Sequence, residues 1–380
     1  MPPSNVTSDV VIIGGGVIGL AIARELALNR VGKVMLIERS QPGREASFAA
    51  AGMLAPQAEA DAADDFFRLC CRSRDLYPPF AQSLLDETGI DVELDQTGTL
   101  YCGFSEHDQE ELDRRFDWQT RSGLLVEKLT AREARELEPH VAENVGGGLR
   151  FPRDIQVENR RLLTALKTAN ERSAVTLVTN TEVTSLRVEQ GKVVGVATSA
   201  GFIGSRNVVI AGGAWTSRIG IGNVAAPIRI EPVRGQMICF EPAAAIARHV
   251  IYSPRGYIVP RRDGRLLAGS TTEEVGFDKS VTEMGVESIR SRAVEISPRI
   301  SGLPVTDSWA GLRPRAPDCL PVLGAAPETK GLFYATGHYR NGILLAPLTG
   351  ELITRLIADN VVLPELAAFA PDRFSPVTVN

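Results

Sequence analysis

A hydrophobic run broken by glycines near the start of the chain constrains the fold more than any other feature. The segment DVVIIGGGVIGLAIARELALN, residues 9–29, is typical of a buried strand, a glycine turn and a helix. Gly14 permits a tight turn, Gly16 lets a pyrophosphate approach the backbone, and Gly19 lets the helix pack close to the strand. The positive end of the helix then faces the phosphates.

The next strand supports a nucleotide site. KVMLIERS, residues 33–40, contains Glu38 at the strand end, 19 residues beyond Gly19, where a carboxylate can accept hydrogen bonds from ribose hydroxyls. A glycine turn without a ligand would leave Glu38 unexplained. Strand, glycines, helix, strand and acid in this order predict a dinucleotide-binding βαβ unit, but they do not separate NAD from FAD.

Two later segments repeat the pattern of a buried strand that ends in glycine. They are NVVIAGGAW, residues 207–215, and GLFYATG, residues 331–337. Strands of this kind belong side by side in one parallel sheet. The intervening segments VELDQTGTLYCGF and YIVPRRDGRLLAGSTTEE contain turn pairs typical of antiparallel ribbons.

The fold class that follows combines α/β and α+β structure in two discontinuous domains. We expect a Rossmann-like FAD-binding domain and a substrate-binding domain with an antiparallel sheet. The first is assigned to residues 1–80, 151–225 and 309–380, and the second to residues 81–150 and 226–308.

Composition narrows the classes of partner. The chain has 380 residues and a formal net charge of −5, without a dense basic run, so neither nucleic acid nor an anionic membrane surface is an expected partner. The longest apolar run, Val10 to Ala23, is short of the roughly 20 residues that span a bilayer. Five cysteines without a C-x-x-C pair, and four histidines without ligand spacing, predict neither a disulfide framework nor a metal site. No signal peptide is recognised, and we expect a cytoplasmic protein.

Two segments are ambiguous on their own. REASFAAAGMLAPQ, residues 44–57, is a run of small residues that suits either a segment lying flat against a planar ring or the start of an alanine-rich helix. ATGHYRNGILLAP, residues 335–347, is a polar turn before a helix expected from Gly342. Such a turn is either a solvated surface feature or the wall of a cofactor site.

A family resemblance runs through nearly the whole chain. SWAGLRPRAPDCLPVLG followed by GHYRNGILLAP, together with FPRDIQVENRRLLTAL and YIVPRRDGRLLAGST, resembles the D-amino acid oxidase-like family of FAD-dependent amine oxidases. Within that family, these segments are most similar to the glycine oxidases of thiamine biosynthesis.

The resemblance implies which residues surround the FAD. Besides Gly14, Gly16 and Gly19 of the turn, the positions that match are Val17, Ile18, Glu38, Arg39, Ala46, Ser47, Ala51, Gly52, Met53 and Val183. Around the isoalloxazine they are His338, Tyr339, Arg340, Asn341, Gly342, Ile343 and Leu344. The helix from Gly342 would aim its positive end at the flavin pyrimidine edge.

The resemblance also implies a substrate site. Arg313 would bind the substrate carboxylate through two parallel hydrogen bonds, Tyr257 would add a hydroxyl donor, and Arg340 would border the amine. Alone, Arg313 could be a surface arginine and Tyr257 a core residue. Sarcosine oxidases of the family tether flavin through a cysteine whose place is taken here by about Gly311, so we expect non-covalent FAD.

The implied function is FAD-dependent oxidation of glycine and other small amino acids by hydride transfer from Cα to flavin N5. The imino acid would hydrolyse to glyoxylate and ammonia, or supply the thiazole of thiamine, and O2 would be reduced to hydrogen peroxide. No catalytic side chain is predicted, because the cofactor performs the redox step. The resemblance implies a homo-oligomer, with a tetramer as a candidate.

Several alternatives remain. Within the family they are a sarcosine oxidase, a D-amino acid oxidase, and a dehydrogenase with another electron acceptor. Outside it they are an NAD-dependent dehydrogenase and a non-catalytic flavoprotein subunit. Arg313 and Tyr257 argue against the last, because a structural subunit does not need a carboxylate clamp.

Overall fold

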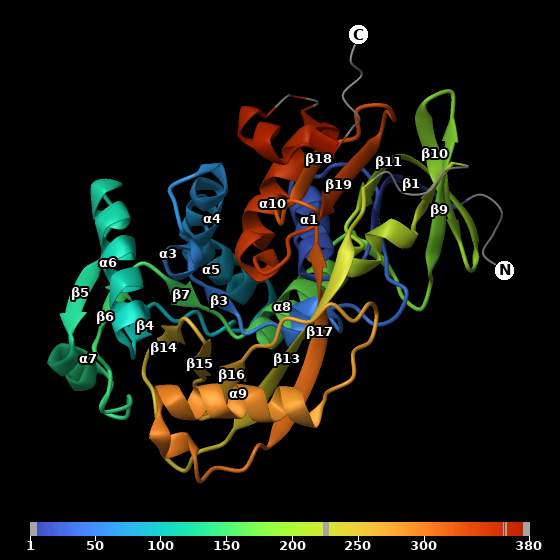
Figure 1. The fold of residues 1–380 in the computed structure, drawn as a ribbon. Coiled ribbons are helices and arrows are strands. Elements are labelled where there is room, and N and C mark those ends of the chain that lie inside the picture. Colours follow the sequence, from blue (N-terminus) through green and yellow to red (C-terminus); the bar gives the residue numbers. More distant parts are fainter. Residues whose placement is uncertain (1–5, 223–227, 360, 362, 375–380) are drawn as a thin grey trace.

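The computed structural model describes residues 6–222, 228–359, 361 and 363–374. These residues form two lobes that lie against each other, each built around one large sheet (Figure 1). A small ribbon of β3 (Met53–Leu54) and β7 (Ile155–Gln156) lies between them. Among the described residues, no helix has both the length and the apolar character needed to cross a membrane.

The first sheet has the strand order β12-β9-β10-β11-β1-β2-β8, with β19 beside β11 and β18 beside β19. Its strands are β1 (Thr7–Ile13), β2 (Val34–Ile37), β8 (Thr176–Val178), β9 (Val183–Glu189), β10 (Lys192–Thr198), β11 (Gly201–Ile210), β12 (Gly220–Ile221), β18 (Val322–Ala325) and β19 (Leu332–Thr336). β1 pairs in parallel with β2 and β11, and β11 pairs in parallel with β19. The expected parallel arrangement of the three buried, glycine-ended strands is confirmed. Because they run in the same direction, their glycine-containing ends meet at one edge of the sheet.

Helices bury one face of this sheet. Val10 and Ile12 of β1 pack in the core beneath α1 (Val17–Leu28), whereas Val11 and Ile13 point into a second core on the other face. The alternation follows the two-residue period of a strand and explains why residues 10–13 of β1 are all apolar. The other helices of this lobe, which pack on or near α1, are α4 (Asp65–Asp75), α5 (Tyr77–Thr88), α8 (Asn159–Arg172) and α10 (Gly342–Ala358).

The second sheet has the order β17-β13-β16-β15-β14-β4-β6-β5. Its strands are β4 (Thr99–Gly103), β5 (Glu127–Thr130), β6 (Gly147–Phe151), β13 (Glu231–Phe240), β14 (Val250–Ser253), β15 (Gly256–Pro260), β16 (Leu266–Gly269) and β17 (Asp307–Arg315). All neighbouring strands in it are antiparallel except β14 and β4. The predicted fold class is therefore confirmed.

Three helices cover this sheet, and their starts follow from the sequence. α6 (Glu106–Arg121) begins with a capping box between Ser105 and Asp108, and α7 (Ala131–Leu137) begins with one between Thr130 and Glu133. α9 (Glu283–Ile296) packs across β13, β15 and β16 at the bottom of Figure 1. The remaining short elements are α2 (Ala46–Ala49), α3 (Pro56–Glu59), η1 (Gly213–Arg218), η2 (Pro298–Ile300), η3 (Pro364–Phe369) and η4 (Pro371–Phe374).

Three of the expected domain boundaries need correction, and the one at residue 226 lies outside the described residues. The boundary at residue 151 cuts β6, whose Phe151 pairs with Thr99 of β4. The boundary at residue 81 cuts α5, whose Ala81 and Leu84 belong to the core beneath α1. The boundary at residue 309 cuts β17, which pairs with β13 from Asp307 to Arg315. A continuous helix or ladder cannot be divided without breaking its hydrogen bonds, so the first lobe includes all of α5 and the second includes all of β6 and β17.

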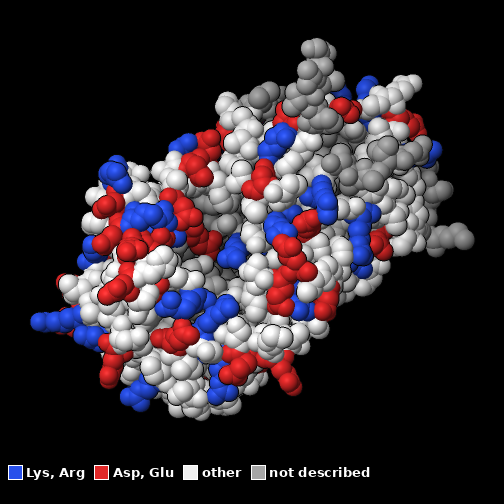
Figure 2. All heavy atoms as spheres, in the orientation of Figure 1, with Lys and Arg blue, Asp and Glu red and all other residues white. Residues whose placement is uncertain are grey.

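The molecular surface mixes both signs of charge. On the face shown in Figure 2, Lys and Arg side chains alternate with Asp and Glu side chains over both lobes. Ion pairs between exposed side chains include Arg72 with Glu351 and Arg132 with Glu136. Exposed pairs of this kind contribute little to stability.

Candidate active site

One cavity lies where the two lobes meet, at the edge of the first sheet where β1, β11 and β19 end. The expected residues that line it are Gly14, Gly16, Val17, Ile18, Glu38, Arg39, Ala46, Ser47, Ala51, Gly52, Met53, Val183, Tyr257, Arg313, His338, Tyr339, Arg340, Gly342 and Ile343. Crevices beyond the carboxyl ends of parallel strands are the usual ligand sites of such sheets.

Three expected residues do not line this cavity. They are Gly19, Asn341 and Leu344. The side chain of Leu344 is buried in the hydrophobic core, and its carbonyl accepts a hydrogen bond from Ser73. Leu344 points away from the cavity because only one face of the first turn of α10 lies against the cavity.

The glycine turn has two tightly packed glycines and an open one. Gly14 has φ +110°, and a Cβ added there would lie 2.4 Å from the Ala211 carbonyl oxygen. A Cβ at Gly19 would lie 1.9 Å from the Gly14 carbonyl oxygen. At Gly16 the nearest atom would be Ser47 Oγ at 3.5 Å. Gly14 and Gly19 therefore allow the turn and helix to form, whereas Gly16 leaves room for a ligand at the start of α1.

Glu38 braces the same turn. Its side chain is buried, and the carboxylate accepts hydrogen bonds from the backbone N–H of Gly15 at 2.7 Å and of Ser40 at 3.0 Å. Glu38 is therefore not a solvated charge at a strand end. It borders the cavity from a position fixed by the turn.

A connected group of charged side chains borders the cavity beside α2. Arg39 pairs with Glu45 at 2.6 Å and lies 3.7 Å above the ring of Trp215, while Glu45 also pairs with Lys279 at 2.9 Å. Lys279 comes from the second lobe, so this chain of charges joins the two lobes. The predicted residue Val183 lines the same cavity.

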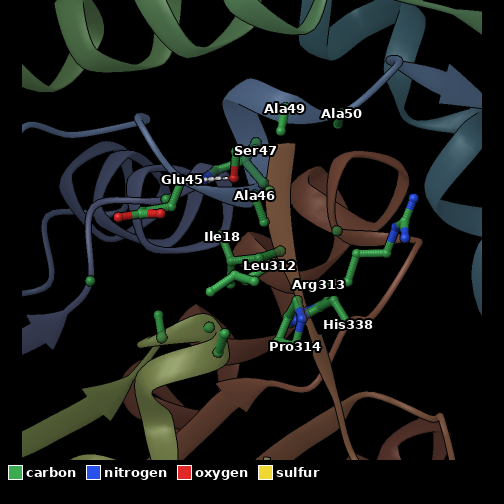
Figure 3. A pocket seen from close by; sticks show the side chains of 18 of the residues that line it. Ile18, Glu45, Ala46, Ser47, Ala49, Ala50, Leu312, Arg313, Pro314 and His338 are labelled. Atoms are coloured by element: carbon green, nitrogen blue, oxygen red, sulfur yellow. Dashed lines mark hydrogen bonds between the residues drawn. The ribbon is translucent and has the colours of Figure 1, made fainter. Parts of the chain in front are cut away.

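The segment of small residues contains a four-residue helix, α2, followed by extended chain. Ala46 and Ser47 lie close to Ile18 and Leu312 in Figure 3. A Cβ added at Gly311 of β17 would lie 2.5 Å from the Cβ of Ala49. Small residues are thus required on both sides for α2 to approach β17.

The polar turn before α10 forms another wall. Tyr339 has a left-handed backbone with φ +47°, and Asn341 N–H donates to the His338 carbonyl at 2.8 Å. The N-cap residue of α10, Asn341, makes no side-chain capping hydrogen bond, and Gly342 and Ile343 of the first turn line the cavity. His338 contacts Thr349 Oγ1 through Nε2 at 3.2 Å, and burial lowers the pKa of His338 to about 3. The imidazole is therefore neutral, and the positive end of the helix is the local electrostatic feature.

Arg313 places a cation in the cavity wall. It is half-buried and donates from Nη1 to the Thr271 carbonyl at 3.0 Å and from Nη2 to Ser270 Oγ at 2.8 Å. Among the described residues, no carboxylate forms an ion pair with it. Tyr257 lies in the same wall, and its hydroxyl donates to Met237 Sδ at 3.3 Å. Burial lowers the pKa of Arg313, which reflects the cost of a charge without a counter-ion.

Arg340 is more exposed than Arg313. Its Nη2 donates to Thr272 Oγ1 at 3.0 Å. Its guanidinium therefore lies at the edge of the cavity rather than in its interior.

Several lining residues escaped the sequence analysis. They are Glu59, Trp215, Gly235, Met237, Tyr252 and Ser270. Glu59 lies in the otherwise ordinary segment APQAEAD, and Gly235 lies inside a strand without a turn signal. The alternation of β14 and β15 could have suggested Tyr252, because it faces Tyr257 across that ribbon.

The chain matches a family model described as FAD dependent oxidoreductase over residues 9–356. It is 38% identical over 367 residues to the glycine oxidase of Geobacillus kaustophilus (strain HTA426), which covers 96% of this chain and 97% of that protein. It is also 38% identical over 381 residues to the bifunctional protein ThiO/ThiG of Trichormus variabilis, covering 97% of this chain and 55% of that protein.

Solved structures agree with these sequence matches. The crystal structure of glycine oxidase from Geobacillus kaustophilus superposes with a TM-score of 0.91 at 36% identity, over 96% of this chain and 98% of that chain. L-proline dehydrogenase from P. horikoshii superposes with a TM-score of 0.86 at 25% identity, over 97% and 98% of the two chains.

Proposed function

The chain belongs to the family of FAD dependent oxidoreductases, and on that premise we propose that it oxidises glycine and other small amino acids. Relatives named glycine oxidase align with nearly the full length of this chain. The chain is therefore an FAD-dependent amino acid oxidase. The substrate preference within that class is the part we propose.

The cavity residues fit FAD. The open face of Gly16 and the start of α1 suit a pyrophosphate, and Glu38 suits the ribose hydroxyls beside it. The uncapped start of α10 suits a ring that gains negative charge on reduction. When bound, FAD supplies a hydride acceptor for the substrate Cα and a donor of electrons to O2.

Arg313 is the observation that supports an amino acid substrate most strongly. It is a half-buried guanidinium with neutral hydrogen-bond partners at Thr271 and Ser270. A substrate carboxylate would supply the missing negative charge through charge-assisted hydrogen bonds. Tyr257 would add a hydroxyl donor, and Arg340 would border the amino group from the cavity edge.

Orientation and exclusion of water are the roles that we assign to the protein. Arg313 would fix the carboxylate and thereby Cα, while α2 and β17 close the wall on either side. The imino acid product would hydrolyse to glyoxylate and ammonia in water. The similarity to ThiO/ThiG proteins supports a second fate, delivery of the imine to a thiazole-forming partner. A cytoplasmic homo-oligomer remains our expectation for the assembly.

A substrate panel tests the proposal. Purified yellow protein is mixed with glycine, sarcosine, D-alanine and L-proline, and hydrogen peroxide release is measured beside reduction of an artificial electron acceptor. We expect the highest kcat/KM with glycine and peroxide as a product. Preference for sarcosine or a D-amino acid would reassign the substrate, and reduction of the artificial acceptor without peroxide would indicate a dehydrogenase.

A further inference from the structure

The four-residue helix α3 is fixed by a dense set of buried polar groups. Asp154 accepts hydrogen bonds from the N–H of Gln57 at 3.3 Å and of Ala58 at 3.0 Å, and its side chain is fully buried. Arg115 of α6 donates to the carbonyls of Ala58 at 3.1 Å and Ala60 at 2.8 Å. Both ends of the short helix are therefore held by side chains from elsewhere in the chain.

A reciprocal pair of amides adds a third attachment. Gln57 Nε2 donates to Gln119 Oε1 at 2.9 Å, and Gln119 Nε2 donates to the Gln57 carbonyl at 2.9 Å. Both side chains are buried. If α3 moved, their polar groups would lose these hydrogen bonds without gaining bonds to water, which would be energetically costly. These contacts fix α3 in place, and with it the side chains that it carries.

The residue that α3 carries into the cavity is Glu59. It is half-buried and lines the wall that also contains Arg313, Tyr257 and Tyr252. The positive charges of Arg340 and Arg313 act on its carboxyl group, and Tyr252 lies within hydrogen-bonding reach. Burial nevertheless raises the pKa of Glu59, because desolvation outweighs these contacts.

The other acids of the cavity wall occupy a different region. Glu38 braces the glycine turn, Glu45 pairs with Arg39 and Lys279, and Glu182 adjoins Val183. Those positions belong to the part of the cavity that suits FAD. Glu59 is the acid that shares a wall with Arg313, so this end of the cavity presents a negative and a positive group together.

We propose that Glu59 is a specificity-determining residue that binds the positively charged amino group of the incoming substrate, while Arg313 binds its carboxylate. The ammonium group loses one proton to solvent before hydride leaves Cα, because only the free amine has the lone pair that forms the C=N bond of the imino acid. This inference rests on the proposed function and makes it more specific, because it defines the substrate class as zwitterions with one carboxylate. A second carboxylate on the substrate would be repelled by the negative charge of Glu59, so substrates with two carboxylates would bind poorly. The attachments of α3 keep Glu59 at a fixed position in the cavity, close enough to Arg313 for the two charges to act on each other.

The test compares glycine with glycolate, which has the same size and carboxylate but a neutral hydroxyl in place of the ammonium group. KM and kcat for glycine and the inhibition constant of glycolate are measured on the FAD-loaded Glu59→Gln variant. Loss of one hydrogen bond to a charged group corresponds to about a 10- to 100-fold effect. We expect KM for glycine to rise by that factor, with glycolate inhibition nearly unchanged.

Two further variants complete the test. Glu59→Asp keeps the charge and should recover part of the glycine affinity. Glu110→Gln on α6 makes the same substitution at an exposed side chain outside the cavity, and should match the wild type. An unchanged KM for glycine in Glu59→Gln, or equal weakening of glycine and glycolate, would overturn the inference. Wild-type protein that binds FAD but releases no peroxide with glycine would instead contradict the proposed function.

Discussion

The guanidinium of Arg313 lies directly against the backbone of Gly235. A Cβ added at Gly235 would lie 2.3 Å from Arg313 Nη2 and 2.4 Å from its Cζ. The two residues belong to neighbouring strands, β17 and β13, whose pairing places Gly235 opposite Gly311. The absence of a side chain at Gly235 therefore creates the space in which the guanidinium is held.

Gly235→Ala should damage the substrate site and spare the cofactor site. Overpacking of a well-packed position costs about 1–3 kcal/mol, which here would be relieved by displacement of Arg313. We expect KM for glycine to rise about tenfold or more, with an unchanged FAD dissociation constant. Gly302→Ala is the matched control, because a Cβ there meets no atom within 4 Å. Equal kinetics in the two variants would show that the position of Arg313 does not depend on Gly235.

Glu38→Ala should weaken FAD binding in two ways, because it removes both the brace of Gly15 and the acceptor for the ribose. A hydrogen bond to a charged group is worth about 1.5–3 kcal/mol, so the FAD dissociation constant should rise about 10- to 100-fold. Fluorescence titration of the apoprotein measures this, and the order of preferred substrates should remain the same. Glu189→Ala, at an exposed strand end, serves as the control. An FAD affinity equal to that of the control would remove Glu38 from the cofactor site.

FAD should be released intact when the protein is precipitated with acid. Among the described residues, no cysteine lines the cavity, and Gly311 occupies the place where a tethering cysteine is expected in sarcosine oxidases. Absorbance of the supernatant and of the pellet distinguishes the outcomes. Yellow colour retained in the washed pellet would show a covalent attachment.

Stability should fall between about pH 6.5 and pH 3 in part because of His338. Burial lowers its folded-state pKa to about 3 from an ordinary value of 6.5, so the unfolded chain binds a proton in this range and the folded chain does not. The contribution of His338 to the unfolding free energy then falls by at most about 1.4 kcal/mol per pH unit as pH decreases. Chemical denaturation of wild type and His338→Asn at several pH values measures the difference. Parallel pH dependences would show that His338 is not kept neutral by the fold.

The core of the first sheet was predictable because three of its strands contain buried apolar segments. Residues 10–13 of β1, 208–210 of β11 and 332–335 of β19 are buried and apolar and are followed within two residues by glycine, a pattern typical of parallel strands at a ligand edge. The capping box of Thr130 and Glu133 was also visible in the sequence, since it depends only on local spacing.

Other features depend on contacts between distant segments. Gly235 and Arg313 are 78 positions apart, and nothing in the local sequence of either indicates that one makes room for the other. Glu59 is positioned by Asp154 and Arg115, which lie in a different part of the chain. The domain boundary at residue 309 was misplaced because the pairing of β17 with β13, rather than the composition of β17, determines its lobe.

The most direct measurement is kcat/KM for glycine in Arg313→Ala beside the wild type, with FAD content determined on the same samples. Truncation of one partner of a buried charge pair costs about 2–5 kcal/mol, so we predict a loss on the order of 10²-fold or more with FAD retained. Arg313→Lys should recover part of the activity, because it keeps the charge but loses the planar fork. Oxidation of glycine by FAD-loaded Arg313→Ala as efficiently as by the wild type would contradict the assignment of this cavity as a carboxylate-binding oxidase site.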